Sequence, residues 1–407
     1  MKCRHCGKVL EHVFLDLGFA PPSNAYLTVQ QLNEPEVTLP LRLFVCDSCW
    51  LVQTQDFSRP EALFDFDYAY YSSTSQTWLN HAKAFAKDIT ERFNLNRNSF
   101  VVEIASNDGY LLRNFLVPGI PCLGIEPTHG TAEVAEKLGI PVLREFFNSE
   151  LARNLAEKKK ADLIIGNNVY AHVPDINDFT VGMRELLNEN GVISLEFPHL
   201  MQLIENNQFD TVYHEHFSYL SLYTVSRIFE AANLRIWDVE QLSTHGGSLR
   251  IYGCHAEDTR PSTPAVADLL AEEARRGLQT LDTYQNFQAS ANKVKDDLLS
   301  FLLEQKRAGK KVAAYGAAAK GNTLLNYAGV KPDLLPFVCD AAPAKQGKYM
   351  PGSHIPILPP SALAASAPDY VLILPWNIAA EVKQQNATLA AQGTIFVTAV
   401  PKLHLLT

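Results

Sequence analysis

Strand and helix patterns alternate twice along this 407-residue chain, and the alternation constrains its fold more than any other feature. Between residues 100 and 173, short apolar runs such as FVVEI (100–104) and CLGI (122–125) are separated by helical stretches. The alternation resumes at KKVAAYG (310–316) and continues through three further runs, LLPFVCD (334–340), DYVLILPW (369–376) and GTIFVTAV (393–400). Such patterns build parallel sheets covered by helices. We therefore predict an α/β protein with two doubly wound sheets joined by a helical linker.

Cysteine spacing adds a third module at the N-terminus. Four of the seven cysteines form two tight pairs, Cys3 with Cys6 in CRHC and Cys46 with Cys49 in CDSC. Each pair can direct two thiolates at one ion, and two pairs complete a tetrahedral zinc site that is closed to water. A redox role is disfavoured because no thioredoxin-like context surrounds either pair. We predict a zinc-ribbon-like module with a structural zinc ion over residues 1–59.

The loop after the run at 100–104 carries small and polar residues where a strand passes into a helix. The backbone of such a turn can approach a bound cofactor closely. The layout resembles the E-x-G-x-G-x-G motif of class I S-adenosylmethionine methyltransferases, with Ala105 and Asn107 in place of two glycines. The candidate cofactor-binding residues in this stretch are Glu103, Ala105, Asn107, Asp108 and Gly109.

Glu126 follows the next apolar run and strengthens the prediction of an adenosyl cofactor. A carboxylate about 20 residues beyond the loop can accept hydrogen bonds from both ribose hydroxyls. NAD is the competing cofactor, but Asp108 would repel its pyrophosphate and suits the cationic methionine end of S-adenosylmethionine instead. Asn167 and Asn168 end a later strand, and their amides can contact the methionine end, contact the substrate or cap a turn.

The segment TVYHEHFSYLS (211–221) concentrates titratable side chains. A metal site made of His214, Glu215 and His216 is disfavoured, because adjacent residues rarely converge on one ion in the way that the two histidines of HExxH do. A polar helix start is the structural alternative. The remaining possibility is that these residues move protons, because histidine near pH 7 is a ready general base.

Two glycine-containing turns are candidates for substrate contact. STHGGSLR (243–250) places His245 and Arg250 around a pair of glycines, where they can meet a sugar or its phosphates, or where the chain can simply form a hairpin. YGAAAKGNT (315–323) places Lys320, Asn322 and backbone amides at a predicted helix start. Such a start attracts pyrophosphate, and close packing is the alternative explanation.

Composition limits the partners. The formal net charge of −9 gives no electrostatic attraction to nucleic acid, whose binding depends on neutralised phosphates. The N-terminus lacks the apolar core of a secretory signal, and no apolar run approaches the roughly 20 residues of a spanning helix. We expect a cytoplasmic protein, monomeric or homodimeric, that binds neither nucleic acid nor membrane.

The motifs occur together in an order that resembles the nucleotide-sugar C-methyltransferase family over essentially the whole chain. They are the two CxxC pairs, VEIASNDG, GIEP, YHEH, HGGSLR, YGAAAKGNT and PGSHIPI. The resemblance implies a zinc-binding domain (1–59), a class I methyltransferase domain with a Rossmann-like sheet (60–255), and a helical linker with a second Rossmann-like domain that helps to hold the nucleotide sugar (256–407). The implied cofactors are S-adenosylmethionine and structural zinc. The implied substrate is a nucleoside-diphosphate 4-keto-6-deoxy sugar, methylated at C3.

The resemblance also implies roles for individual side chains. His216 is the expected base, and Glu215 is either an alternative base or an orienting group. Tyr213 and a tyrosine of the preceding aromatic cluster, Tyr68 or else Tyr70, are expected near the C4 oxygen. Two other hypotheses remain open from the sequence: an O- or N-methyltransferase with the same cofactor site, and a non-enzymatic zinc-ribbon protein, which would require a basic patch.

Overall fold

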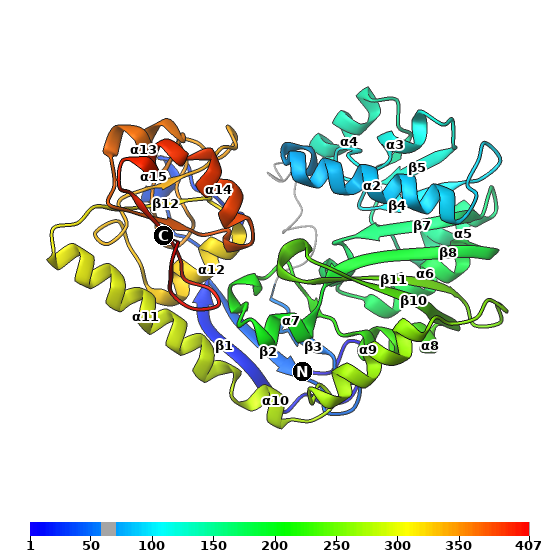
Figure 1. The fold of residues 1–407 in the computed structure, drawn as a ribbon. Coiled ribbons are helices and arrows are strands. Elements are labelled where there is room, and N and C mark those ends of the chain that lie inside the picture. The colour runs from blue at the N-terminus through cyan, green and yellow to red at the C-terminus, as the bar shows by residue number, and fades with distance from the viewer. Residues whose placement is uncertain (58–70, 407) are drawn as a thin grey trace.

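The computed structural model describes residues 1–57 and 71–406, which form three sheets with their covering helices (Figure 1). A seven-stranded sheet lies in one lobe and a six-stranded sheet in the other, and N-terminal strands lie beneath and between the two lobes. The predicted α/β class, with an N-terminal module and two Rossmann-like sheets, is confirmed. The proposed boundary between residues 59 and 60 lies outside the described residues.

The central sheet has the order β10-β11-β8-β7-β4-β5-β6. Its strands β4 to β8 are parallel to one another, and β11 and β10 continue the sheet in antiparallel fashion. The strand order reverses beside β4, and ligands bind at such a reversal, beyond the carboxyl ends of the strands. The strands are β4 (Val101–Ile104), β5 (Cys122–Ile125), β6 (Val142–Leu143), β7 (Ala161–Asn167), β8 (Leu187–Pro198), β10 (Leu234–Leu242) and β11 (Ser248–His255).

Helices cover both faces of the central sheet. At several of their starts a side chain accepts a backbone amide, as Asn148 and Asp175 do at α5 and α6. The helices of this lobe are α2 (Gln76–Arg92), α3 (Arg113–Leu116), α4 (His129–Lys137), α5 (Ser149–Ala156), α6 (Ile176–Leu186), α7 (Leu200–Glu205) and α8 (Leu222–Ala231). Short 3-10 turns include η3 (Tyr170–His172), η4 (Phe209–Thr211) and η5 (Thr244–Gly246).

The N-terminal sheet has the order β1-β2-β3-β9 and is antiparallel. Its fourth strand belongs to a distant part of the sequence, because β9 begins two residues after His216, the last residue of YHEH. The strands are β1 (His12–Ala20), β2 (Leu39–Val45), β3 (Val52–Thr54) and β9 (Ser218–Tyr219). The zinc-binding module is therefore joined through its own sheet to the segment that carries the predicted base.

The C-terminal lobe contains a sheet of order β14-β13-β12-β15-β16-β17, parallel except for β17. The predicted linker forms α9 (Pro264–Arg275), α10 (Asp282–Gln285) and α11 (Phe287–Arg307). The strands are β12 (Val312–Tyr315), β13 (Val338–Cys339), β14 (Ile357–Leu358), β15 (Tyr370–Ile373), β16 (Ile395–Thr398) and β17 (His404–Leu406). The helices are α12 (Ala319–Ala328), α13 (Ser361–Ser366), α14 (Ala379–Gln385) and α15 (Ala387–Ala391), with a 3-10 turn η6 (Trp376–Ile378).

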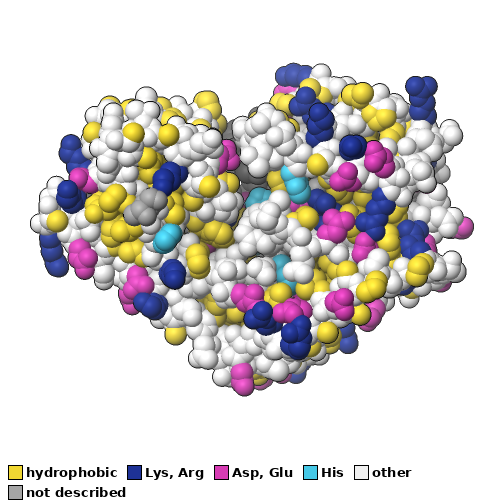
Figure 2. Space-filling view, viewed as in Figure 1, with side chains coloured by type: hydrophobic (Ala, Val, Ile, Leu, Met, Phe, Trp, Pro, Cys, Tyr) yellow, Lys and Arg dark blue, Asp and Glu magenta, His cyan; other side chains and the backbone are white. Residues whose placement is uncertain are grey.

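One hydrophobic core joins the N-terminal sheet to the C-terminal lobe. Phe14 of β1 stacks on Phe287 of α11 with ring centroids 4.7 Å apart, and side chains of α12 belong to the same cluster. Figure 2 shows Lys and Arg side chains interspersed with Asp and Glu on one face, so the charge there is mixed. Among the residues that the structure describes, no helix is both long and apolar enough to cross a membrane.

Candidate active site

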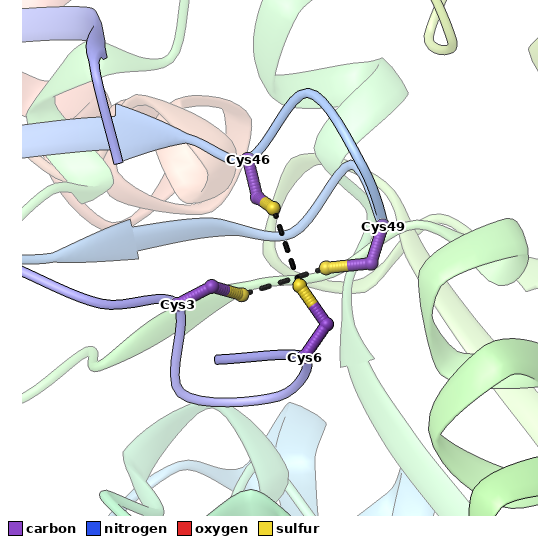
Figure 3. A group of neighbouring side chains, drawn as sticks. All are labelled: Cys3, Cys6, Cys46 and Cys49. Carbon is purple, nitrogen blue, oxygen red and sulfur yellow. Dashed lines mark hydrogen bonds between the residues drawn. The ribbon is translucent and has the colours of Figure 1, made fainter. Parts of the chain in front are cut away.

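The four paired cysteines converge at the edge of the N-terminal sheet (Figure 3). The Sγ atoms of Cys3 and Cys49 lie 3.5 Å apart, as do those of Cys6 and Cys46, and all four lie within 4.8 Å of one another. A zinc ion about 2.3 Å from four tetrahedral sulfurs would space those sulfurs about 3.8 Å apart. The cluster therefore fits a zinc ion closed to water, in agreement with the sequence-based prediction.

A cavity of about 520 Å³ opens at the carboxyl ends of β4, β5 and β7 and extends to the C-terminal lobe. Ala105 and Asn107 line its wall with φ angles of 58° and 49°, in the left-handed region. Gly109 has φ 76°, and a Cβ there would lie 2.4 Å from Ile140 Cδ1. The backbone of this loop thus has the shape that glycines usually supply, and Ala105 and Asn107 adopt it despite their side chains.

The predicted acids of the cofactor site take different positions. Glu126 lines the cavity and accepts hydrogen bonds from the amides of Asn107 and Thr128, each at 2.9 Å. Asp108 is buried and accepts the Ser73 amide at 3.0 Å, so its carboxylate fixes the approach to α2. Glu103 is buried beneath the loop, where burial raises the pKa of its carboxyl group well above the usual value. Neither Glu103 nor Asp108 is among the described residues that line the cavity.

The two asparagines that end β7 face the cavity. Among the residues that the structure describes, neither polar atom of the buried Asn167 side chain has a hydrogen-bond partner, and Oδ1 of Asn168 has none either. Asn168 Nδ2 lies 3.3 Å from His245 Nε2. Buried amides without partners are costly unless a ligand satisfies them. Together with the loop and Glu126, they fit the polar ends of S-adenosylmethionine.

His216 lines the cavity and is buried, with 7% of its surface exposed. Its Nδ1 is 3.1 Å from the Thr211 carbonyl oxygen, so Nδ1 carries the proton and Nε2 presents its lone pair. Burial lowers the pKa of His216 well below its usual value, and the neighbouring His172 adds to the effect. The imidazole is therefore neutral at pH 7, in the form that a general base requires.

The other residues of the YHEH segment point in different directions. The Tyr213 ring lies against His216 with centroids 4.1 Å apart and also lines the cavity. Glu215 is buried at the cavity wall and accepts a hydrogen bond from Asn24 Nδ2 at 2.7 Å. His214 turns toward β2, where its Nε2 lies 3.3 Å from the Pro40 carbonyl oxygen. Tyr68 and Tyr70 lie outside the described residues.

Sequence reasoning missed His172, which lines the cavity at the end of η3. Its ring meets that of His216 edge-on with centroids 4.5 Å apart, and burial lowers the pKa of His172 to about 4. In this stretch the sequence pattern points to Asn167 and Asn168 and not to His172. The available signal was a histidine five residues past a cofactor-facing strand end.

The C-terminal lobe closes the far side of the cavity with the first turn of α12. Lys320 donates to Asn377 Oδ1 at 2.9 Å and lies 4.8 Å from the Trp376 ring, and burial lowers the pKa of its ammonium group. Lys345 also lines the cavity and donates to the Ala317 carbonyl at 2.8 Å. Two lysines and the start of α12 therefore line the cavity together.

Of the other three residues predicted to contact the substrate, one lines the cavity and two are not among the described lining residues. His245 lines the cavity in the β10–β11 hairpin turn, with a φ of 54°. Arg250 is not among the described lining residues; its Nη2 pairs with the buried Glu196 at 2.7 Å. Asn322 is buried in α12 and donates to the Ser23 carbonyl at 2.6 Å, also away from the described lining. The structure thus gives Arg250 and Asn322 partners within the protein.

The fold and the cavity define an S-adenosylmethionine-dependent methyltransferase with a zinc-binding module. Three family models match the chain in succession. Their descriptions are "Putative zinc binding domain" (3–64), "Methyltransferase domain" (78–239) and "C-methyltransferase C-terminal domain" (243–401).

Over 402 residues the chain is 33% identical to C-methyltransferase NovU of Streptomyces niveus. The alignment covers 98% of this chain and 96% of that protein. The chain therefore belongs to this family of C-methyltransferases.

Solved structures resemble part of the chain. An S-adenosylmethionine-dependent methyltransferase from Clostridium acetobutylicum aligns with 44% of this chain and 92% of its own, at 13% identity and a TM-score of 0.35. A methyltransferase from Archaeoglobus fulgidus aligns with 42% of this chain and 93% of its own, at 14% identity and a TM-score of 0.34. These values are too low to indicate a substrate.

Proposed function

We propose that this enzyme methylates C3 of a nucleoside-diphosphate 4-keto-6-deoxy sugar, in the biosynthesis of a branched deoxysugar. One observation carries the proposal: the cofactor loop, the neutral His216 and two lysines of the C-terminal lobe face a single cavity. A C-methyltransferase must create a carbon nucleophile, and a base beside the cofactor site supplies one. Methylation of oxygen or nitrogen has no need of an enolising base.

The base acts on a proton made acidic by the neighbouring ketone. Nε2 of His216 takes the C3 proton, and the electron pair of the C3–H bond moves into an enolate with its charge on the C4 oxygen. General base catalysis of this kind contributes about 10²- to 10⁴-fold in rate. Glu215 remains the alternative base; its hydrogen bond to Asn24 supports an orienting role instead.

The enolate oxygen needs a hydrogen-bond donor. Tyr213 is a candidate donor, because it lines the cavity and its ring packs against His216. His172 is a second candidate donor, because it lines the cavity beside His216 and a neutral imidazole keeps one N–H. Tyr68 or Tyr70 stays a prediction for the same role.

The cofactor and the nucleotide occupy opposite ends of the cavity in this proposal. S-adenosylmethionine, when bound, supplies an electrophilic methyl group to C3. Glu126 would hold its ribose, and Asn167 would pair with its methionine end. At the other end, Lys320, Lys345 and the first amides of α12 would hold the diphosphate of the substrate.

The test is product analysis with methyl-¹³C S-adenosylmethionine. Purified enzyme is incubated with several nucleoside-diphosphate 4-keto-6-deoxy sugars, and the product is examined by NMR. The proposal expects a labelled methyl carbon bonded directly to C3, and a His216→Asn variant that turns over about 10²-fold more slowly but still binds S-adenosylhomocysteine. A labelled O-methyl or N-methyl signal would instead identify the competing reaction.

A further inference from the structure

The first zinc-binding turn, CRHC, packs against the two loops that carry His172 and His216. The side chain of Arg4 in this turn is 7% exposed. Its Nη1 donates to the carbonyl oxygen of Pro174 at 2.7 Å, and its guanidinium carbon lies 5.4 Å from the centroid of the Phe217 ring. Pro174 lies two residues after His172, and Phe217 directly follows His216. One guanidinium group therefore contacts both loops.

The two loops are also tied to each other and to β3. The Phe217 amide donates to the Ala171 carbonyl at 2.8 Å, and the Thr54 amide donates to the Phe217 carbonyl at 3.1 Å. Thr54 Oγ1 donates to the His216 carbonyl at 3.2 Å, while Arg4 Nη2 donates to the Thr54 carbonyl, also at 3.2 Å. The backbone beside His216 is thus fixed from the zinc-binding module.

A buried glutamine connects this arrangement to the cysteine cluster. Gln53 is fully buried; its Oε1 accepts the Arg4 amide at 2.9 Å, and its Nε2 lies 3.3 Å from Cys3 Sγ. On the opposite side of the turn, Asn177 Nδ2 donates to the His5 carbonyl at 2.8 Å. Zinc bound by the four cysteines would fix the turn that presents Arg4 to the loops.

We propose that Arg4 is a positioning residue for the reaction: held by the zinc-bound turn, its guanidinium group sets the placement of the His172 and His216 loops in the cavity. The kinetic part of this inference rests on the proposed function. Arginine can contact both loops because its planar guanidinium group donates hydrogen bonds in several fixed directions. A lysine ammonium group on its flexible stem would reach one of the two carbonyl groups and would lose the contact with the Phe217 ring.

The test compares three variants of the zinc-loaded, full-length enzyme. Arg4→Met keeps the apolar stem and removes the donors, Arg4→Lys keeps the charge, and Lys8→Met removes a half-exposed charge from the same module as a matched control. The measurements are kcat, affinity for S-adenosylhomocysteine, zinc per chain, and the imidazole NMR signals of His172 and His216.

The proposal expects Arg4→Met to lower kcat by about 10- to 100-fold, because small displacements of reacting groups have effects of that size. Cofactor affinity and zinc content should stay within about twofold of the parent values, since neither site uses the Arg4 side chain. The two imidazole signals should shift in Arg4→Met and stay in place in Lys8→Met. The kcat and the imidazole signals of Arg4→Lys should lie between those of the parent and those of Arg4→Met. If Arg4→Met does not fold, Arg4→Lys tests the proposal in its place.

Three results would overturn the proposal. They are unchanged imidazole signals and kcat in both Arg4 variants, an equal loss of kcat in Lys8→Met, or a loss of kcat that only follows a loss of zinc. If the parent enzyme methylates no 4-keto sugar, the proposed function fails separately. The imidazole signals then still show whether Arg4 positions the two histidines.

Discussion

Glu273 holds the start of helix α8 through its hydrogen bonds. This carboxylate of α9 is fully buried and accepts the amides of Leu222 and Tyr223, the first two of α8, at 2.6 and 2.8 Å. It also lies 2.7 Å from His199 Nε2. The hydroxyl oxygen of Ser221 accepts the next amide of α8, that of Thr224, at 3.1 Å. Glu273 therefore satisfies two of the four amides that a helix start leaves without intrahelical partners.

Replacing Glu273 with alanine removes three hydrogen bonds and leaves buried donors without acceptors. Leaving a buried donor without an acceptor costs about 1 to 3 kcal/mol, so we expect about 3 to 5 kcal/mol for the three donors together. This cost corresponds to an increase of about 10²- to 10⁴-fold in the opening equilibrium of α8. Glu272 is the matched control, because the adjacent carboxylate pairs with Arg276 at the surface.

Hydrogen exchange read by mass spectrometry measures this opening locally, without assuming that a protein of several modules unfolds in one step. Peptides that cover α8 should exchange faster in Glu273→Ala by the stated factor and at the parental rate in Glu272→Ala. Exchange within about threefold of the parent in Glu273→Ala, or equal acceleration in both variants, would refute the reasoning.

Three further predictions follow from the cavity. Glu126→Ala should weaken the binding of S-adenosylhomocysteine by about 10²-fold, because hydrogen bonds to a charged group contribute about 1.5 to 3 kcal/mol each. Calorimetry measures the affinity, and the zinc content should be unchanged. An unaltered affinity would remove Glu126 from the site. Burial lowers the pKa of both His172 and His245 to about 4, so unfolding takes up protons as the pH falls. The free energy of unfolding should therefore be highest above pH ~6.5 and decline toward pH ~4. In urea titrations at several pH values, His245→Gln should make this decline less steep. The same pH dependence in the variant and the parent would contradict the prediction. Gly246→Ala should lower the free energy of unfolding by about 1 to 3 kcal/mol, because its Cβ would lie 2.3 Å from Trp376 Cη2 at a φ of 91°; a parental urea midpoint would contradict this.

Local patterns predicted the elements but not every contact between them. The apolar run before Glu103 and the small-residue loop after it were enough to predict β4 and a cofactor turn, because both depend on nearby residues. The same reasoning could not show that Glu103 lies beneath the loop while Glu126 lines the cavity, since burial depends on the packing of the whole sheet.

Long-range pairing explains the other differences. The two-residue strand β9 pairs with β3 from a position more than 160 residues away in sequence, and no local pattern specifies that partner. Arg250 was a reasonable candidate for a phosphate contact by charge. Its partner Glu196 lies on the neighbouring strand β8, which the spacing of the hairpin motif could not reveal.

We propose a carbanion at C3 that forms with His216 as the base. The most direct measurement follows the C3 proton by NMR in D2O, with a nucleoside-diphosphate 4-keto-6-deoxy sugar and S-adenosylhomocysteine bound. His214→Asn is the matched control, because that neighbouring histidine faces the Pro40 carbonyl. We expect the C3 signal to be lost with the parent and with His214→Asn, and to be retained with His216→Asn. Exchange at the parental rate in His216→Asn, or no exchange in the parent with the sugar bound, would contradict it.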